Sequence, residues 1–309
     1  MQIVQNPGDW NRAGQKTCIA IGVFDGVHLG HQHVIRQTVS DATQHEAAAL
    51  VVTFDRHPNS VVAPDRVPPQ IYSLSQKLRA IEALGGDAAW VIHFDQAFSK
   101  LTGAEFVRGL VRDFGPIYSV CVGSEFTFGH KRSGNVSLLQ ALGRDLHFTV
   151  HGLAAVSLDG LVVSSTRIRE AVRAGQLEQA GEMLGRPYSV AALVIPGDQV
   201  ARTFNFPTAN LDIRGMVLPP NGVYAAHAWC EGKCWRSVVN LGFRPTRAET
   251  VPTLHLEAHL LDFTGDLYGK ELELAFVEKL RDERKFPSLE ALRHQIVQDI
   301  TCARGVFPG

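Results

Sequence analysis

The 309-residue sequence lacks the features that mark several large classes of protein. Its 30 basic and 31 acidic side chains give a formal net charge of −1, so it has no basic excess for gripping a nucleic-acid backbone. No stretch approaches the roughly 18 consecutive apolar residues of a membrane span. We therefore expect neither a nucleic-acid partner nor membrane association, and phosphorylated small molecules stay open as ligands.

Cysteine is scarce as well. The five cysteines are scattered and include no CxxC pair, which indicates neither a disulfide framework nor a structural zinc site. The first residues show no basic start followed by an apolar core, which predicts a cytoplasmic protein. Because 45% of the residues are hydrophobic, the chain can bury substantial cores, and its length indicates roughly two domains. The sequence leaves a homo-oligomer open.

The first half alternates short β-rich runs with helix-like segments. Strands are predicted at 17–24, 48–55, 88–94, 117–122 and 146–150. Helices are predicted at 31–40, 73–84 and 102–114, and Thr102 and Glu105 in the last have the spacing of a capping box. This alternation predicts an α/β domain with a doubly wound, Rossmann-like parallel sheet.

The second half has strand signals with Gly, Pro and Asn turns between them. Strands are predicted at 188–195, 222–229, 235–241, 254–261 and 272–277, followed by a single helix at 288–302. Several short strands without intervening helices predict a small all-β barrel closed by the terminal helix. The rhythm changes near the segment Leu184-Gly185-Arg186-Pro187, so we predict domains at 1–185 and 186–309.

The segment GVFDGVHLGH, residues 22–31, follows the first predicted strand directly and leads into a helix. Free N–H groups at such a helix start bind phosphates. Gly26 and Gly30 would let the backbone approach a nucleotide, and His28 and His31 would stabilise charge at phosphorus. Neither a GxGxxG nor a GxxxxGK[ST] pattern is present. A zinc site built from His28, His31 and His33, with Asp25 nearby, is the alternative.

Three further motifs fall at the ends of predicted elements in the first half. Ser165 and Thr166 open a helix on which Arg169 is available for phosphate oxygens, although ordinary capping is the alternative. His57 follows the second strand. Glu125, Phe126 and Phe128 follow the fourth. All lie at the carboxyl edge of the predicted sheet, where α/β sheets bind ligands.

In the second half, two segments carry groups that suit a second phosphoryl transfer. Thr208 and Asn210 offer oxygens to Mg²⁺, although a plain turn fits the same letters. Residues 254–260 alternate strictly and place Glu257 on one strand face with His255 and His259. A carboxylate there could take a proton from an alcohol, or the face could simply be solvated.

These motifs, in this order, resemble the bacterial bifunctional riboflavin kinase/FMN adenylyltransferase (FAD synthetase) family from about Thr17 to the C-terminus. The resemblance implies an HxGH nucleotidyltransferase domain in which FMN attacks ATP to give FAD and pyrophosphate, with Mg²⁺ as cofactor. His28 and His31 would stabilise the transition state. Ser165, Thr166 and Arg169 would hold the β- and γ-phosphates. The nucleotide or flavin would contact Gly22, Phe24, Asp25, Gly26, Gly30, His57, Glu125, Phe126 and Phe128.

The resemblance also implies a riboflavin kinase barrel. There the segment 207–210 would bind Mg-ATP through Thr208 and Asn210, with Arg202 nearby, and Glu257 would be the base for the riboflavin 5′-hydroxyl. The loop before it departs from the family pattern, because Pro196, Ala201 and Asn205 replace a His and two Gly residues. Earlier in the chain, Arg56 replaces a Pro and Glu125 an Asp or Asn.

Several functions follow as alternatives. The first is a bifunctional enzyme of flavin synthesis that acts on riboflavin, FMN and ATP. The second is an FMN adenylyltransferase whose barrel only binds flavin, because the missing loop glycines would slow or abolish the kinase. The others are a flavin-sensing regulatory protein and an enzyme that transfers a nucleotide to another phosphorylated alcohol.

Overall fold

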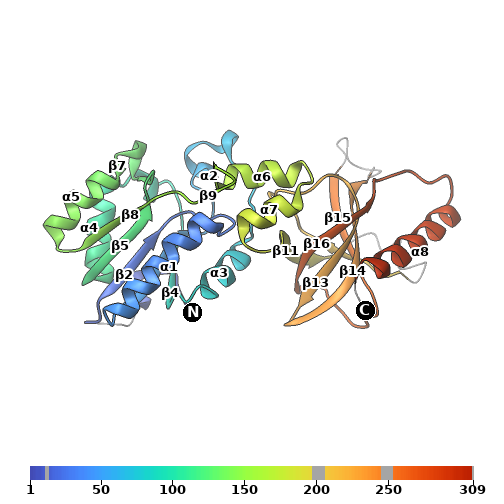
Figure 1. The fold of residues 1–309 in the computed structure, drawn as a ribbon, viewed down its shortest axis with the longest axis horizontal. Coiled ribbons are helices and arrows are strands. Elements are labelled where there is room, and N and C mark those ends of the chain that lie inside the picture. The colour runs from blue at the N-terminus through green and yellow to red at the C-terminus, as the bar shows by residue number, and fades with distance from the viewer. Residues whose placement is uncertain (11–13, 197–205, 245–252, 308–309) are drawn as a thin grey trace. The chain divides into compact units, whose positions relative to one another are not determined.

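The computed structural model describes residues 1–10, 14–196, 206–244 and 253–307. Two compact units form within the chain (Figure 1). The first comprises Met1–Gln70 and Leu74–Thr166, and the second comprises Ile71–Ser73 and Arg167–Gly309. The domain boundary between residues 185 and 186 stays a prediction.

The first unit is built on a six-stranded sheet in which every neighbouring pair of strands is parallel. The strand order is β1-β4-β3-β2-β5-β8. The strands are β1 (Gln2–Val4), β2 (Thr17–Ile21), β3 (Ala48–Phe54), β4 (Ala88–Ile92), β5 (Ile117–Gly123) and β8 (Thr149–Leu153). Because β3 and β5 flank β2 on opposite sides, the winding direction reverses at β2. A crevice for ligands is expected at the carboxyl ends of these strands.

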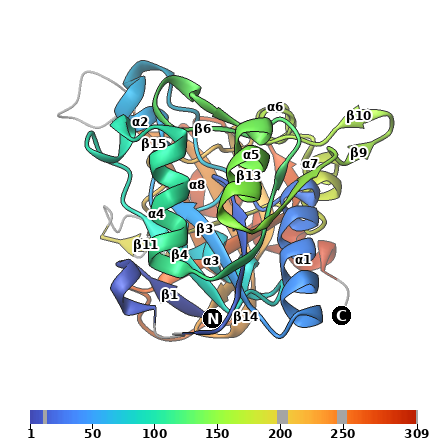
Figure 2. The same ribbon diagram turned by 90° about the vertical axis from the view of Figure 1, so that its left-hand side faces the viewer.

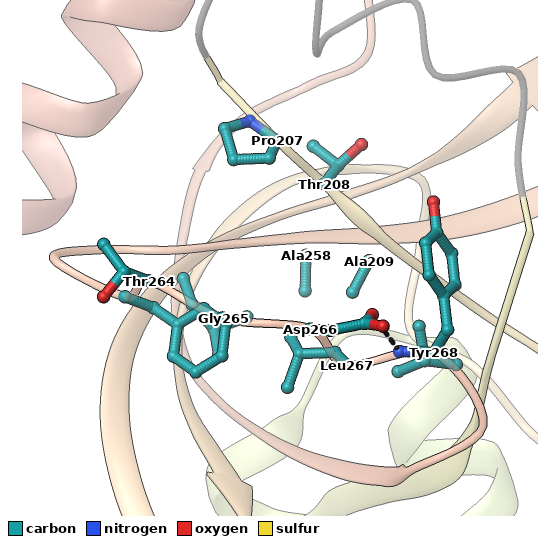
Figure 3. Close-up of a pocket in the computed structure, with 12 residues that line it drawn as sticks. Pro207, Thr208, Ala209, Ala258, Thr264, Gly265, Asp266, Leu267 and Tyr268 are labelled. Carbon is teal, nitrogen blue, oxygen red and sulfur yellow. Dashed lines mark hydrogen bonds between the residues drawn. The ribbon is translucent and has the colours of Figure 1, made fainter.

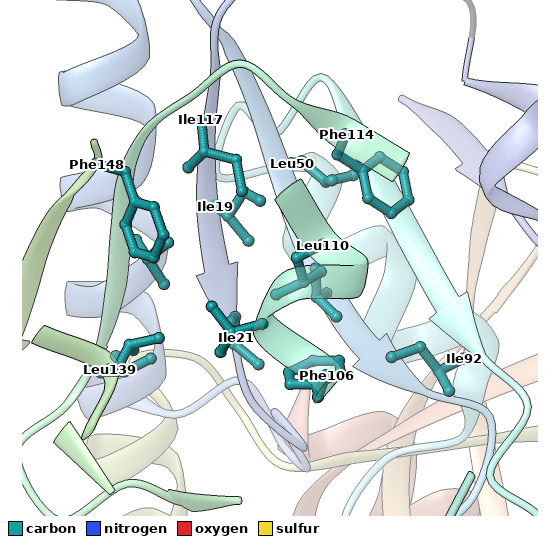
Figure 4. Close-up of a cluster of buried hydrophobic side chains, with 14 of the residues drawn as sticks. Ile19, Ile21, Leu50, Ile92, Phe106, Leu110, Phe114, Ile117, Leu139 and Phe148 are labelled. Carbon is teal, nitrogen blue, oxygen red and sulfur yellow. The ribbon is translucent and has the colours of Figure 1, made fainter. Parts of the chain in front are cut away.

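Helices cover both faces of the sheet (Figure 2). The alternation of strand residues explains how, since Ile19 and Ile21 of β2 pack with α4 (Gly103–Phe114) and α5 (Val136–Leu146). Figure 4 shows Phe106, Leu110 and Phe114 in this cluster. Ala20 faces the other way, toward α1 (Leu29–Gln44) and α3 (Leu74–Glu82). The prediction of a doubly wound parallel sheet is confirmed.

The strand expected at 146–150 was misplaced. Helix α5 continues through Leu146, and β8 begins only at Thr149. The Asn135 side chain caps α5 by accepting the Leu138 amide at 2.9 Å, and the left-handed backbone of His147 ends the helix. Leu146 therefore belongs to the last turn of an amphipathic helix.

Several short elements had no sequence prediction. They include β1, whose three residues are too few to show a period. The others in the first half are α2 (Asn59–Val62), the two-stranded pairs β6 (Thr127–Phe128) with β7 (Gly134–Asn135) and β9 (Ser157–Leu158) with β10 (Leu161–Val162), and α7 (Leu177–Leu184). The helix that the sequence places at Ser165 is present as α6 (Ser165–Arg173).

The second unit contains a closed barrel of six strands in the order β11-β12-β15-β14-β13-β16, with every pair antiparallel. The strands are β11 (Ser189–Ile195), β12 (Ala209–Leu211), β13 (Gly222–Cys230), β14 (Lys233–Arg244), β15 (Thr253–Leu260) and β16 (Glu271–Arg281). Helix α8 (Leu289–Val306) packs on the barrel through Ala303, which clusters with Ala225 and Phe307. The prediction of a small barrel with a C-terminal helix is confirmed.

Candidate active sites

The turn after β2 has an unusual backbone. Phe24 has a φ of 52° and Val27 a φ of 40°, in a region that residues with a Cβ rarely adopt, and Gly26 lies between them at 79°. Each such residue other than Gly costs about 1–3 kcal/mol. The side chains of Phe24 and Val27 are buried, so the core holds the strained turn in place.

Neighbouring side chains also support the carbonyls of this turn. Thr53, which is fully buried near the end of β3, donates its hydroxyl to the Val23 carbonyl at 3.0 Å. Ser165 donates to the Asp25 carbonyl at 3.1 Å, across 140 positions of sequence. The structure therefore brings Ser165 to the turn.

The two histidines of the motif lie together at the start of α1. His28 is the N-cap, and its Nδ1 accepts the His31 amide at 3.4 Å. The imidazole rings stack with centroids 3.6 Å apart and an interplanar angle of 21°. Because Nδ1 of His28 accepts a hydrogen bond, the neutral ring carries its proton on Nε2, where it can donate to an oxyanion.

Two glycines of the motif leave room for the rings of Phe24 and His28. A Cβ on Gly22 would lie 2.8 Å from the Phe24 ring, and one on Gly30 would lie 3.2 Å from Cε1 of His28. His33 lies exposed two positions after His31 on the same helix, so the two side chains diverge. This geometry disfavours the zinc alternative.

Helix α6 carries the remaining phosphate-binding candidates of the first half. Ser165 is its first residue and Thr166 is exposed in its first turn. Arg169 lies one turn later, on the same side of the helix as Ser165, and is 7% exposed.

A cavity of about 710 Å³ opens at the carboxyl ends of β2 and β3 in the first unit. It begins beside the turn at Ile21 and Val23. Aromatic side chains line it, and the basic residues Lys100, Lys131 and Arg132 border it. The phenylalanines are Phe54, Phe94, Phe98, Phe106, Phe126 and Phe128. The sequence analysis found two of them, Phe126 and Phe128, whose rings stack with centroids 5.2 Å apart.

The other two candidates at this edge lie differently. Glu125 is exposed. His57 is half-buried, and its Nδ1 accepts the amide of Asn59, which lines the cavity together with Pro58. His57 thus shapes one border of the cavity through the start of α2.

Two charged groups at the same edge were missed by the sequence analysis. Burial opposes the ionisation of Asp55, but hydrogen bonds from the Phe94 amide, His93 and Arg56 hold the pKa of this carboxyl below its usual value. Burial lowers the pKa of Lys77 to about 8, against the attraction of Asp25 and Asp55. Because α3 also carries Gln76 and Arg79, Lys77 has the sequence signature of an ordinary solvated helix residue.

In the barrel, a row of polar residues crosses three adjacent strands. Glu257 of β15 is paired in register with Asn210 of β12 on one side and with Asn240 of β14 on the other. Side chains paired in this way lie on one face of a sheet. Glu257 is 5% exposed, so the solvated-face alternative is wrong for this residue.

Two cavities meet near this row. One, of about 250 Å³, lies between the barrel and α8 and is lined by Asn240, Glu257 and Arg281 among others. The second, of about 730 Å³, extends to the segment from Phe263 to Tyr268 (Figure 3). Thr208 lines both cavities. The structure therefore brings Thr208, Asn210 and Glu257 together, whereas Arg202 lies outside the described residues.

An ion pair at the smaller cavity attaches α8 to the barrel. Arg281 donates two hydrogen bonds, of 2.8 and 2.7 Å, to the carboxylate of Asp299. Gln295 donates to the same carboxylate at 2.7 Å. Such bidentate, mostly buried pairs fix geometry well, so the wall that α8 supplies is held rigidly.

Comparison with known proteins shows the family to which this chain belongs. The family model described as FAD synthetase matches residues 11–167, and the model described as riboflavin kinase matches residues 184–307. A bifunctional riboflavin kinase/FMN adenylyltransferase of Pseudomonas fluorescens is 38% identical over 296 residues, which cover 96% of this chain and 94% of the relative. The chain belongs to the bifunctional riboflavin kinase/FMN adenylyltransferase family.

Another family member is similar to this chain in sequence, and one solved structure is similar to it in fold, each over nearly its whole length. The bifunctional riboflavin kinase/FMN adenylyltransferase of Escherichia coli (strain K12) is 34% identical over 309 residues, covering 99% of this chain and 98% of the relative. A crystal structure titled as a macrolide-efflux protein from Streptococcus pneumoniae superimposes with a TM-score of 0.80 at 25% identity, covering 98% of both chains. Among the helices of the described residues, none is both long and apolar enough to cross a membrane.

Proposed function

We propose that this chain makes FAD from riboflavin in two ATP-dependent steps. Its barrel transfers the γ-phosphoryl group of ATP to riboflavin, and its parallel-sheet unit then transfers the adenylyl group of a second ATP to FMN. The observation that carries this proposal is the pair of separately built sites, each with the groups that its step requires. Membership of a family with both activities supports it.

In adenylyl transfer, a phosphate oxygen of FMN bonds to the α-phosphorus of ATP while the bond to the β-phosphate oxygen breaks and pyrophosphate leaves. Negative charge grows on the non-bridging oxygens and on the leaving group. The start of α1 directs backbone N–H groups toward this charge, and Nε2–H of His28 adds a donor beside it. His31 supports the orientation of His28 by stacking on it. Ser165, Thr166 and Arg169 hold the departing phosphates.

The aromatic cavity is the FMN site of this step. Its phenylalanine rings suit the flat, apolar ring system of a flavin, since aromatic faces stack with each other favourably. The basic border suits a dianionic phosphate. The cavity also reaches Val23, in the turn that leads to the histidine motif.

In the kinase step, Glu257 accepts the proton of the riboflavin 5′-hydroxyl as its oxygen bonds to the γ-phosphorus of ATP and ADP leaves. The buried carboxylate, with Asn210 and Asn240 beside it in register, is positioned at the cavity between the barrel and α8, which would hold riboflavin. The larger cavity would hold ATP. Because Thr208 lines both cavities, it marks the place where the phosphoryl group passes between them.

Mg²⁺ fits this kinase site by the chemistry of its donors. Thr208 and Asn210 present a hydroxyl and an amide oxygen, and Mg²⁺ binds hard oxygen ligands together with phosphates. When bound, the ion neutralises phosphate charge. In our proposal Thr208 and Asn210 would hold the Mg²⁺ ion, and Glu257 accepts the proton of the riboflavin hydroxyl without binding the ion.

The test incubates the purified chain with ATP and Mg²⁺, once with riboflavin and once with FMN, and separates the flavins by chromatography. FAD in both reactions supports the proposal. FAD from FMN alone would overturn the kinase half and leave an adenylyltransferase with a flavin-binding barrel. Absence of FAD in both would overturn adenylyl transfer and favour a flavin-sensing role or another nucleotidyl acceptor.

A further inference from the structure

A buried lysine connects two backbone segments that border the adenylyl-transfer site, namely the turn after β2 and the end of β3. Lys77 lies on α3 and is 7% exposed. Its Nζ donates to the carbonyl of Phe54, at the end of β3, at 2.7 Å, and to the carbonyl of Val23, in the turn after β2, at 3.3 Å. The first carbonyl ends β3 and the second follows β2, its neighbour in the sheet, so a single ammonium group bridges two adjacent strand ends.

Each of these carbonyls adjoins a group that the reaction uses. Val23 precedes Phe24, whose positive φ begins the strained turn that leads to His28. Phe54 lines the aromatic cavity. A displacement of either loop would therefore change the distance between the nucleotide-binding turn and the flavin-binding cavity.

We propose that Lys77 is a positioning residue for adenylyl transfer. Through its two carbonyl hydrogen bonds it holds the turn after β2, which leads to His28, at a fixed distance from the end of β3, which borders the flavin cavity. The inference rests on the proposed adenylyl transfer. Lys77 acts through the backbone of Val23 and Phe54, and Thr53, which donates to the same Val23 carbonyl, supports it.

A role in packing alone explains the residue poorly. Helix α3 contributes Ile81 to the core, and an apolar side chain at position 77 would bury without the desolvation that lowers the pKa of this lysine. The nearby carboxylates of Asp25 and Asp55 offset part of that cost. Residues that cost stability where they stand are typical of functional sites.

The experiment compares Lys77→Met, Lys77→Arg and a matched control, Ile81→Val, in the full chain. Ile81 lies on the same helix and is fully buried, but it does not touch the two loops through a hydrogen bond. For each variant, kcat and KM for FMN and ATP are measured in FAD formation, together with riboflavin phosphorylation and the thermal unfolding midpoint.

We expect Lys77→Met to lower kcat for FAD formation about 100-fold, the scale of a misplacement of about 1 Å, with both KM values changing less than about threefold. Lys77→Arg keeps the positive charge and the hydrogen-bond donors, so its kcat should be at least about tenfold higher than that of Lys77→Met. Ile81→Val should lose stability without loss of kcat. Riboflavin phosphorylation should be unchanged in all three, because the kinase site lies in the other unit.

Two results would overturn the inference. The first is a kcat for Lys77→Met within about threefold of the wild type. The second is a loss of kcat in Lys77→Met and Ile81→Val that is proportional to the fall in the thermal unfolding midpoint of each variant. If Lys77→Met does not fold, Thr53→Val decides, since it removes one support of the same carbonyl with little change in volume. A kcat reduced about tenfold supports the inference, and an unchanged kcat overturns it. A wild-type chain unable to make FAD from FMN would instead overturn the proposed function itself.

Discussion

The imidazole rings of His28 and His31 stack at a centroid separation of 3.6 Å, and the amide of the second residue donates to Nδ1 of the first. The spacing of three positions at a helix start produces both contacts, because the N-cap side chain turns back over the first turn. The pair is thus a single unit in which one residue fixes the tautomer of the other.

Replacing His28 with Ala should reduce FAD formation from FMN at least about 1,000-fold, since the charge-stabilising donor is lost. Riboflavin phosphorylation should stay at the wild-type rate. His33→Ala is the matched control, because His33 is an exposed histidine on the same helix. The two steps are followed by chromatography of the flavins. Full FAD formation by the His28 variant would show that the site is wrongly assigned.

Replacing Glu257 with Gln keeps the volume but removes the proton acceptor, so phosphorylation of riboflavin should fall about 100- to 10,000-fold. FAD formation from FMN should persist. Glu231→Gln is a suitable control, because this glutamate pairs with Lys270 at the surface of the same barrel. A Glu257→Gln variant that phosphorylates riboflavin normally would exclude the carboxylate as base.

Gly30 tests how closely the histidine must be held. An added Cβ lies 3.2 Å from Cε1 of His28, so Gly30→Ala should displace the ring by a few tenths of an ångström. We expect kcat for FAD formation to fall about tenfold while the chain stays folded. Gly109→Ala on α4 is the comparison, because its Cβ would meet only the end of the Arg112 side chain, at 3.9 Å. Equal kcat values for the two variants would contradict the prediction.

Lys77 should give the first unit a stability that rises in alkaline solution. Its pKa is about 8 in the folded chain and near 10.5 when unfolded, so between these values the unfolded state binds more protons. The wild type should therefore gain up to about 3 kcal/mol of stability relative to Lys77→Met between pH 8 and pH 10.5.

Denaturant unfolding of both proteins across this pH range measures the difference. The charged groups that act on Lys77 are Asp25, in the turn after β2, and Asp55, at the end of β3, the latter bonded to Arg56 and His93. Against the effect of burial, hydrogen bonds hold the pKa of Asp55 below its usual value, so this carboxylate does not contribute to the slope in alkaline solution. A constant difference between the two proteins would show that Lys77 titrates normally.

Local patterns determined most of the fold. Alternating apolar runs and helical periods predicted the parallel sheet, and turns between short strands predicted the barrel. Both predictions are confirmed. The spacing of apolar residues along the chain shows which face of a strand, or which stripe of a helix, becomes buried. The misplaced strand at 146–150 and the undetected β1 show the limit, because a helix end and a three-residue edge strand leave almost no periodic signal.

The sequence also indicates candidate site residues, because strand-turn-helix signals place a group at the carboxyl edge of a sheet before its neighbours are known. This holds for His28 and His31. In the same way, strict alternation put Glu257 on a definite strand face.

Only the tertiary structure decided which distant residues complete each site. The contact of Ser165 with Asp25 spans 140 positions, and the row of Asn210, Asn240 and Glu257 depends on the register of three strands. The proposed role of Lys77 depends on its hydrogen bonds to two carbonyls that lie on other segments of the fold. A sequence specifies directly what lies within a few turns of chain, whereas cavities, burial and buried charge come from elements packed together, and their energies depend on that packing.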